Sequence, residues 1–406
     1  MQHSSNSYEV IIVGGGPAGS SCAIHLARRG VKVLLLEQKK FPRDKLCGEF
    51  LSPECRDHFR KLGVETEMNS SRPAHLTQTV FYSSSGRQIS VPTEWLTSSA
   101  PAWGLSRAEM DHKLLLKARS AGVTVLEEAS VAEVLTDERL ARGVKAKVDG
   151  ATESYHAPVT IDATGRARAL VRKVNNPTQQ FPHRTRPKLV AFKVHLENAR
   201  VADGACEIYS YHGGYGGLSK IENGLSNLCF IAAARDVRRC DSDPATVIEK
   251  IIAKNPRAAY SLEGAQVRSE WLSVALEGFG RRNLVPIPGL LTVGDSAAFI
   301  DPFTGSGMLM AFESGELAAG AIVSHLRALK SGYSHLSLAR DYQAAYAQKF
   351  NGRLRISGWL RFTAFLPFAD EAAVLFFSLN DRLRRKLARA TRSTARVDAQ
   401  SVSSNL

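Results

Sequence analysis

A glycine-rich loop near the N-terminus, Gly-Gly-Gly-Pro-Ala-Gly, has the residue types and spacing that bind phosphate. It directly follows a β-branched run, and its candidate cofactor-binding residues are Gly14, Gly16, Pro17, Ala18 and Gly19. Gly14 permits a tight turn, Gly16 lets the backbone approach a pyrophosphate, and Gly19 lets the strand and the following helix pack closely. The helix that opens at Pro17 offers N–H groups and a positive dipole end to the phosphates. The loop therefore predicts a dinucleotide site.

A carboxylate follows at the distance that a ribose requires. Glu37 ends the apolar run of residues 31–37, close to the roughly 20-residue spacing at which an acidic side chain reaches a ribose hydroxyl. Residues 17–29, between the two apolar runs, have the pattern of a helix, and the nearly continuous hydrophobicity of the runs is typical of buried parallel strands. The resulting strand–helix–strand unit positions the loop and Glu37. By itself it does not distinguish NAD from FAD.

Three later segments add residues that favour FAD. A strand that runs into a small turn carries Asp162 and Gly165, and a further apolar strand ends in Gly294 and Asp295. Between the glycine loop and these strands, Arg107 opens an amphipathic helix. The order of the four motifs is more specific than a glycine loop alone.

In this order and combination the sequence resembles the flavoprotein superfamily of para-hydroxybenzoate-hydroxylase-type monooxygenases, flavin-dependent halogenases and geranylgeranyl reductases. The resemblance covers most of the chain and implies an FAD-dependent oxidoreductase. It also implies that Asp295 contacts the ribityl chain and that Arg107 contacts the FAD. A helix start with Gly305, Gly307 and Met308 would then lie by the pyrimidine end of the flavin, where helix N–H groups stabilise negative charge on the reduced ring.

Two segments are most similar to the geranylgeranyl-reductase branch. Residues 41–49, Phe-Pro-Arg-Asp-Lys-Leu-Cys-Gly-Glu, resemble its Pro-x-x-Lys-x-Cys-Gly stretch, and residues 301–308 resemble its Pro-x-Thr-Gly-x-Gly pattern. Ser296 stands where aromatic hydroxylases usually carry a histidine soon after Gly-Asp. The Trp-x-Trp-x-Ile-Pro motif of halogenases is absent from the sequence, which argues against halogenation. The first segment supplies the two candidate catalytic residues, Lys45 and Cys47.

Alternatives stay open for four candidate residues. Cys47 either faces the flavin as a proton donor or is a packed loop thiol, and Lys45 either acts on a phosphate or the flavin or is solvated. Tyr215 and His212 lie beside a glycine-rich turn, where this superfamily places sheet residues over the substrate cavity. They are candidate substrate contacts, with core packing as the alternative.

The predicted fold class is α/β. It comprises a Rossmann-type FAD-binding domain, a mainly antiparallel-sheet substrate domain and a helical C-terminal extension. We expect the FAD-binding domain to be discontinuous and the substrate domain to be inserted twice. The expected ranges are residues 1–66, 104–174 and 284–345 for the FAD-binding domain, 67–103 and 175–283 for the substrate domain, and 346–406 for the extension.

Composition narrows the class of partner. The 406 residues carry a formal charge of +14, yet we expect no nucleic-acid partner, because net charge alone specifies none. Six scattered cysteines form no metal-ligand cluster and are expected to be reduced, so no metal is predicted. The N-terminus resembles no secretory signal, which predicts a cytoplasmic protein. A second glycine fingerprint is absent, so transiently bound NAD(P)H or a separate reductase would supply electrons.

We expect redox chemistry on a small hydrophobic substrate, a secondary metabolite or a lipid. Two reactions stay open, hydroxylation or oxidation with O2 and reduction of a C=C bond. A non-catalytic or electron-carrier flavoprotein at a membrane surface is the alternative. Aromatic-rich residues 359–368 and 374–377 precede basic residues 382–389. This segment either makes peripheral membrane contact or closes the cavity with its arginines solvated.

Overall fold

The computed structural model of this protein describes residues 6–96, 100–174, 188–276, 278–330, 335–364 and 369–390. Five short strands form a wholly parallel sheet, and they are β1 (Val10–Val13), β2 (Val33–Leu36), β8 (Thr124–Leu126), β12 (Val159–Asp162) and β20 (Leu290–Thr292). Their order is β20-β12-β1-β2-β8. All carboxyl ends therefore meet at one edge, where Val13 lies opposite both Leu36 and Asp162. Cofactors bind at this edge in open α/β sheets.

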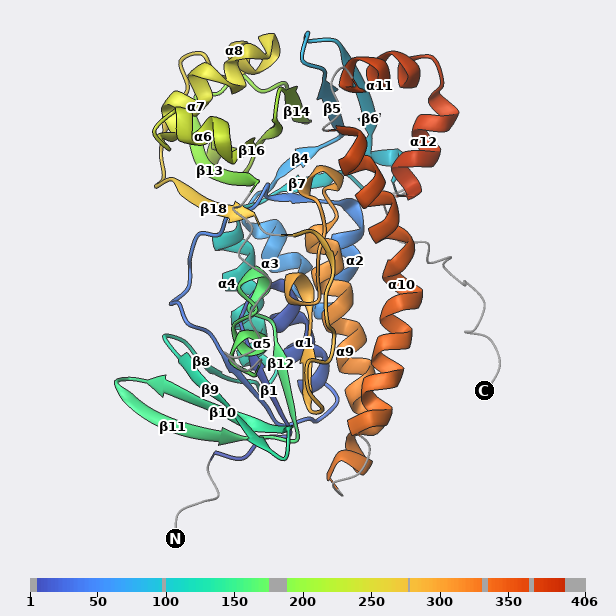
Figure 1. Cartoon of the computed structure of the whole chain (residues 1–406). Coiled ribbons are helices and arrows are strands. Elements are labelled where there is room, and N and C mark those ends of the chain that lie inside the picture. The colour runs from blue at the N-terminus through green and yellow to red at the C-terminus, as the bar shows by residue number, and fades with distance from the viewer. Residues whose placement is uncertain are drawn as a thin grey trace.

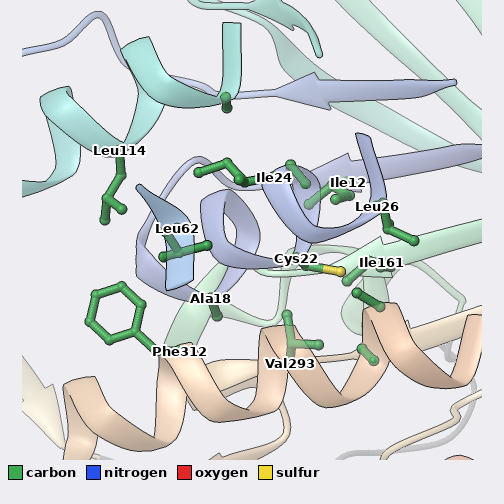
Figure 2. Packing of buried hydrophobic residues seen from close by; sticks show 14 of the residues in the cluster. Ile12, Ala18, Cys22, Ile24, Leu26, Leu62, Leu114, Ile161, Val293 and Phe312 are labelled. Atoms are coloured by element: carbon green, nitrogen blue, oxygen red, sulfur yellow. The ribbon is translucent and has the colours of Figure 1, made fainter. Parts of the chain in front are cut away.

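Different layers cover the two faces of the parallel sheet. One face carries helices α1 (Pro17–Ala27), α4 (Arg107–Ser120) and α9 (Gly307–Lys330). The other carries an antiparallel sheet of β9 (Ser130–Asp137), β10 (Leu140–Val148) and β11 (Ala151–His156). Because side chains alternate along a strand, Ile12 packs among the helices while Ile11 packs on the small sheet. Figure 2 shows the helical side of this core, with Cys22 of α1 and Phe312 of α9.

Close backbone approaches require glycine at three positions in this layer. A Cβ at Gly14, whose φ is +109°, would lie 2.4 Å from the Ala163 carbonyl oxygen. A Cβ at Gly19 would lie 1.9 Å from the Gly14 carbonyl oxygen, and one at Gly315 of α9 would lie 2.5 Å from that of Ala18. No larger residue fits without displacing backbone. These contacts fix α1 directly below the glycine loop.

A second, eight-stranded sheet lies beyond the carboxyl edge of the first. Its strands are β5 (Gln78–Tyr82), β6 (Gln88–Pro92), β13 (Leu189–Glu197), β14 (Ala205–Tyr211), β15 (Gly214–Lys220), β16 (Ser226–Ala233), β17 (Gln266–Val267) and β18 (Leu272–Leu276). They run in the order β17-β13-β16-β15-β14-β5-β6, with β18 also paired to β13. All pairs are antiparallel except β14 with β5. Helices α6 (Ala234–Arg239), α7 (Pro244–Lys250) and α8 (Pro256–Leu262) cover its outer face.

The remaining elements connect these layers. They are β3 (Phe50–Leu51), α2 (Pro53–Leu62), α3 (Glu65–Ser70), β4 (Ala74–Leu76), β7 (Ala102–Gly104), α5 (Ala169–Val174), β19 (Gly280–Arg281), β21 (Ala298–Phe299), α10 (His335–Ala364), α11 (Ala369–Ser378) and α12 (Asp381–Ala390). In Figure 1, α10 runs along one side of the molecule and leads to α11 and α12 beside β5 and β6. No helix among the described residues is long and apolar enough to cross a membrane.

The predicted fold class is confirmed, with a parallel Rossmann-type sheet, mainly antiparallel pairing in the second sheet and a helical C-terminal region. The first residues of the expected substrate-domain range 67–103 are helical, because α3 occupies residues 65–70 and its single buried side chain, Met68, packs into the core. Residues 175–187, the start of the expected substrate-domain range 175–283, lie outside the described residues.

Candidate functional site

A cavity of about 1500 Å³ extends from the carboxyl edge of the parallel sheet across the inner face of the eight-stranded sheet. At the sheet edge its lining includes Gly14, Gly16, Pro17, Ala18 and Glu37. Its far end is lined by residues of α11 and α12. Most small-molecule pockets measure roughly 300–1000 Å³, so this cavity has room for a cofactor together with a second molecule.

The glycine loop forms an open cradle at the start of α1. Gly16 is the N-cap and has no side chain to cap the helix, so the first N–H groups are left for a ligand, and Pro17 occupies the first turn. A Cβ at Gly16 would meet nothing nearer than Arg107 Nη2, at 3.6 Å, so the space above the loop is open toward the cavity. The Gly15 N–H donates to Glu37 Oε2 at 2.8 Å, which orients the carboxylate beside the loop. This arrangement fits a dinucleotide whose pyrophosphate faces the helix N-terminus.

Arg107 is held rigidly against this cradle. Its Nε and Nη2 donate to the two carboxylate oxygens of Asp111 at 2.9 and 2.7 Å, and Arg43 donates to the same carboxylate at 3.0 Å. Asp111 is completely buried, which locks both guanidinium groups in place. Lys45 lines the same part of the cavity, and desolvation together with the charges of Arg43, Arg107 and Arg166 lowers its pKa. The clustered positive charge suits an anionic ligand such as a diphosphate.

Gly294 and Asp295 form a tight turn in the wall of the cavity. Gly294 has φ +58°, and a Cβ there would lie 2.9 Å from that of Ala18, so the turn packs directly on α1. Asp295 lines the cavity, and burial raises the pKa of its carboxyl group while Arg166 and Arg107 oppose that shift. A carboxyl group in such a position can hydrogen-bond the hydroxyl groups of a sugar-like chain.

Cys47 meets the start of α9 across the cavity. Gly305 adopts a left-handed conformation just before α9, and Gly305, Gly307 and Met308 all line the cavity. The Sγ of Cys47 lies 4.0 Å from the Sδ of Met308. Burial raises the pKa of Cys47, so the thiol is protonated at neutral pH. The two sequence motifs most similar to geranylgeranyl reductases thus converge at one point.

Asp162 does not contact the cavity, which corrects its expected role in cofactor binding. Its carboxylate is completely buried and accepts hydrogen bonds from the Thr164 N–H, the Ser296 hydroxyl and two N–H groups of α5. It therefore ties the β12 turn to the Gly294 turn. Gly165, from the same motif, does line the cavity.

The two candidate substrate residues, Tyr215 and His212, lie in different environments. Tyr215 is buried and lines the cavity, and its hydroxyl donates to Asp301 Oδ1 at 2.6 Å. Burial, followed by the charge of Asp301, raises the pKa of Tyr215 well above its usual value. His212 is exposed, pairs with Arg235 Nη2 at 3.1 Å and lies outside the cavity lining. The expectation for His212 is wrong because the β14–β15 turn points it away from the inner face.

Sequence reasoning missed a buried charged cluster beside Cys47. Glu49 is fully buried with φ +53°, and its Oε1 accepts from Lys193 Nζ at 2.7 Å and from the Arg107 N–H at 2.9 Å. Its Oε2 lies 2.7 Å from His195 Nε2, and Lys193 also donates to Asp44 at 3.2 Å. Lys193 is 1% exposed.

A signal for this cluster was present in the sequence. Lys193 and His195 alternate within the apolar strand β13, which puts both on one face of the sheet, and Glu49 ends the Cys47 motif. The ligand atoms of Asp44, Glu49 and His195 lie close enough to hold a metal ion. The Lys193 ammonium already bridges Asp44 and Glu49, so the cluster is read as a buried ion pair.

The family comparison matches these observations. The FAD binding domain family matches residues 7–332. Menaquinone reductase from Mycolicibacterium smegmatis is 26% identical over 385 residues, covering 90% of this chain and 88% of that protein. Conditioned medium factor receptor 1 from Dictyostelium discoideum is 27% identical over 376 residues, covering 86% of this chain and 69% of that protein.

Solved structures with the same fold include a brominase and a reductase-like protein. The flavin-dependent brominase Bmp2 aligns with a TM-score of 0.76 and 22% identity, over 95% of this chain and 93% of that one. A geranylgeranyl bacteriochlorophyll reductase-like protein from Thermoplasma acidophilum aligns with a TM-score of 0.67 and 20% identity, over 95% and 92%. At these identities the likeness establishes the fold and not the reaction.

Proposed function

We propose that this chain, which belongs to the FAD binding domain family, reduces a C=C bond in a long lipophilic molecule of the prenyl type. The observation that carries the proposal is the continuous cavity of about 1500 Å³, which joins the glycine loop to Cys47, to the inner face of the eight-stranded sheet and to α11. A cofactor at the loop leaves the far part of this space for an extended apolar chain.

The walls of the far part suit such a chain. The side chains that line it are predominantly hydrocarbon or aromatic, and they include Phe81, Ile208, Ile231, Leu276, Phe299 and Phe303. Phe303 stacks edge-on against Tyr215 with ring centroids 5.3 Å apart, which fixes the wall nearest to α9. An apolar chain gains roughly 25 cal/mol for each Å² buried here, and its entry displaces water from the reaction site.

Particular residues would hold the cofactor and move the proton. The glycine loop, Glu37, Arg107, Asp295 and the start of α9 would hold FAD, which supplies hydride transfer when bound. Reduction of C=C needs a hydride at one carbon and a proton at the other. The protonated Cys47 thiol, which lines the cavity beside Met308, is placed to donate that proton and to regain one from solvent. NAD(P)H or a separate reductase would restore the two electrons.

The menaquinone reductase relative supports a lipophilic substrate, because it aligns with most of the chain and menaquinone is a lipophilic quinone. Hydroxylation or oxidation with O2 is the competing reaction on the same cavity. A pure electron carrier needs an accessible flavin edge, whereas the enclosing cavity walls favour a bound substrate.

The decisive experiment uses holoenzyme reduced under anaerobic conditions and mixed with a detergent-solubilised prenyl quinone. We expect flavin reoxidation without O2 and a product that remains heavier by two hydrogen atoms after any quinol has been reoxidised to the quinone. Cys47→Ser should lose turnover with normal FAD content. Cys229→Ser changes a second thiol that lines the same cavity from β16, and as the matched control it should keep turnover. A product that forms only with O2 and gains an oxygen atom would replace the proposal with monooxygenation.

A further inference from the structure

Helix α11 presents an apolar stripe to solvent. Ala372, Leu375, Phe376 and Leu379 are exposed and follow the i, i+3, i+4, i+7 spacing of one helix face. Leu375 is 48% exposed, Phe376 58% and Leu379, just past the helix end, 84%. With Trp359 they make up four of the eight large hydrophobic residues exposed in the described part of the chain. Such a concentration marks an interaction surface.

Helix α12 continues with a basic stripe of the same spacing. Arg382, Arg385, Lys386 and Arg389 are exposed, and the half-buried side chains lie on the opposite face. The helix is anchored by Trp95, whose carbonyl oxygen accepts from Arg389 Nε at 3.0 Å and whose ring lies 5.1 Å from the Arg385 guanidinium carbon. The helix that carries the basic stripe is therefore packed against the rest of the protein.

Part of the cavity lining is exposed to solvent at the apolar stripe, and we infer an opening, or mouth, of the cavity there. Ala372 and Phe376 are exposed and also line the cavity, and Trp359 does both at 60% exposure. A molecule that leaves the cavity here passes between apolar side chains. The mouth is thus rimmed by the residues that a hydrocarbon environment would cover.

We propose that α11 and α12 dock on an anionic bilayer surface, with the apolar stripe inserted at the level of the headgroups and the basic stripe against lipid phosphates. Charge complementarity selects this occupant, because the apolar stripe is followed directly by four exposed cations and a single acidic residue, Asp381. Arg385 and Arg389 also contact Trp95, so Arg382 and Lys386 are the two cations chosen for the test. Basic side chains near anionic lipid and inserted apolar side chains act together in interfacial helices. Entry of substrate from the bilayer through the mouth rests on the proposed function, whereas docking does not.

The test is co-sedimentation of the full-length holoenzyme with vesicles of phosphatidylglycerol and phosphatidylcholine, or of phosphatidylcholine alone. We expect binding to the anionic vesicles that weakens at high salt. The partition coefficient should fall roughly 20- to 30-fold in Arg382→Gln/Lys386→Gln, at about fivefold for each cation removed. Leu375→Ser/Leu379→Ser should also lower it. Neither pair lines the cavity, so FAD content and turnover on detergent-solubilised substrate should be unchanged.

Matched controls lie elsewhere on the molecule. Lys145→Gln/Lys147→Gln removes the same charge from the exposed face of β10, the central strand of the small sheet, which Figure 1 places at the opposite end of the molecule. Leu336→Ser removes a leucine that is 76% exposed near the start of α10. Equal loss of binding in the controls, or equal binding to neutral vesicles, would overturn the proposal. So would concentration-dependent dimerisation that the α11 variants abolish without any vesicle binding.

Discussion

Two glycines of one loop are required for different reasons, and a matched pair of substitutions separates them. Gly16 has φ −73°, which any residue adopts, and open space above it, so Gly16→Val should fold normally. Its side chain would occupy the pyrophosphate position, and FAD affinity should fall roughly 100-fold. Gly19→Ala would push a methyl group to 1.9 Å from the Gly14 carbonyl oxygen and should cost roughly 3 kcal/mol of folding stability.

Thermal denaturation and FAD content distinguish the two variants. The Tm of apo Gly16→Val should match that of the apo wild type, while apo Gly19→Ala should melt earlier. If Gly16→Val retains FAD as tightly as the wild type, the cofactor does not approach the loop there.

A second prediction concerns the buried ion pair between Glu49 and Lys193. Lys193→Met would leave the Glu49 carboxylate buried with His195 and the Arg107 N–H as its remaining partners, and should lower the free energy of unfolding by about 3–5 kcal/mol. Lys193→Met/Glu49→Gln should recover part of that loss, because no charge remains uncompensated. Urea denaturation of both, with the exposed Lys147→Met as control, measures the difference. Equal stability of the single and double variants would contradict it.

At the scale of elements, α1, α2 and α9 pack around two histidines that must stay neutral. Burial lowers the pKa of His25 from 6.5 to about 4 and also lowers that of His58. The unfolded chain binds these protons first, so the stability that the neutral histidines contribute is present above pH 6.5 and is lost as the pH falls toward 4. The loss of unfolding free energy on acidification should therefore be smaller in His25→Leu than in the wild type, by about 1–2 kcal/mol.

Melting temperatures at pH 7.5 and 5.0 provide the measurement. The wild type should lose more stability between these values than His25→Leu, whereas the exposed His156→Gln should behave like the wild type. Parallel pH profiles for all three proteins would show that His25 does not titrate in this range.

At the scale of the whole molecule, α11 is hydrogen-bonded to the turn between β5 and β6, which comes from a distant part of the chain. Asp370 accepts from the Ser84 N–H and hydroxyl at 2.7 Å each, and Glu371 accepts from the Ser85 N–H at 2.8 Å. Asp370→Ala/Glu371→Ala removes these hydrogen bonds and should destabilise the packed position of α11 by about 1–2 kcal/mol. The fraction of molecules in which α11 is detached should then rise roughly tenfold. Limited proteolysis should then remove the C-terminal helices faster. An unchanged cleavage rate would mean that apolar contacts alone hold the helix.

Features that depend on short-range order can be predicted from the sequence alone. The glycine loop, Glu37 and the alternation of apolar runs predict a parallel sheet with a dinucleotide at its edge, because spacing within a βαβ unit is local. Cys47 and Met308 were identified in separate motifs that the fold brings within 4.0 Å. The predicted domain boundaries stay predictions.

The side of an element that each residue faces, and the distant residues that it contacts, follow from the way the chain packs in three dimensions. Asp162 and His212 matched plausible patterns, yet one points into a turn network and the other into solvent. Glu49 and Lys193 lie 144 positions apart, so their pairing depends on how the second sheet docks on the first. Likewise, the C-terminal sequence shows that apolar and basic residues are neighbours. Which of them face outward depends on where α11 and α12 rest, because long-range packing buries the opposite faces.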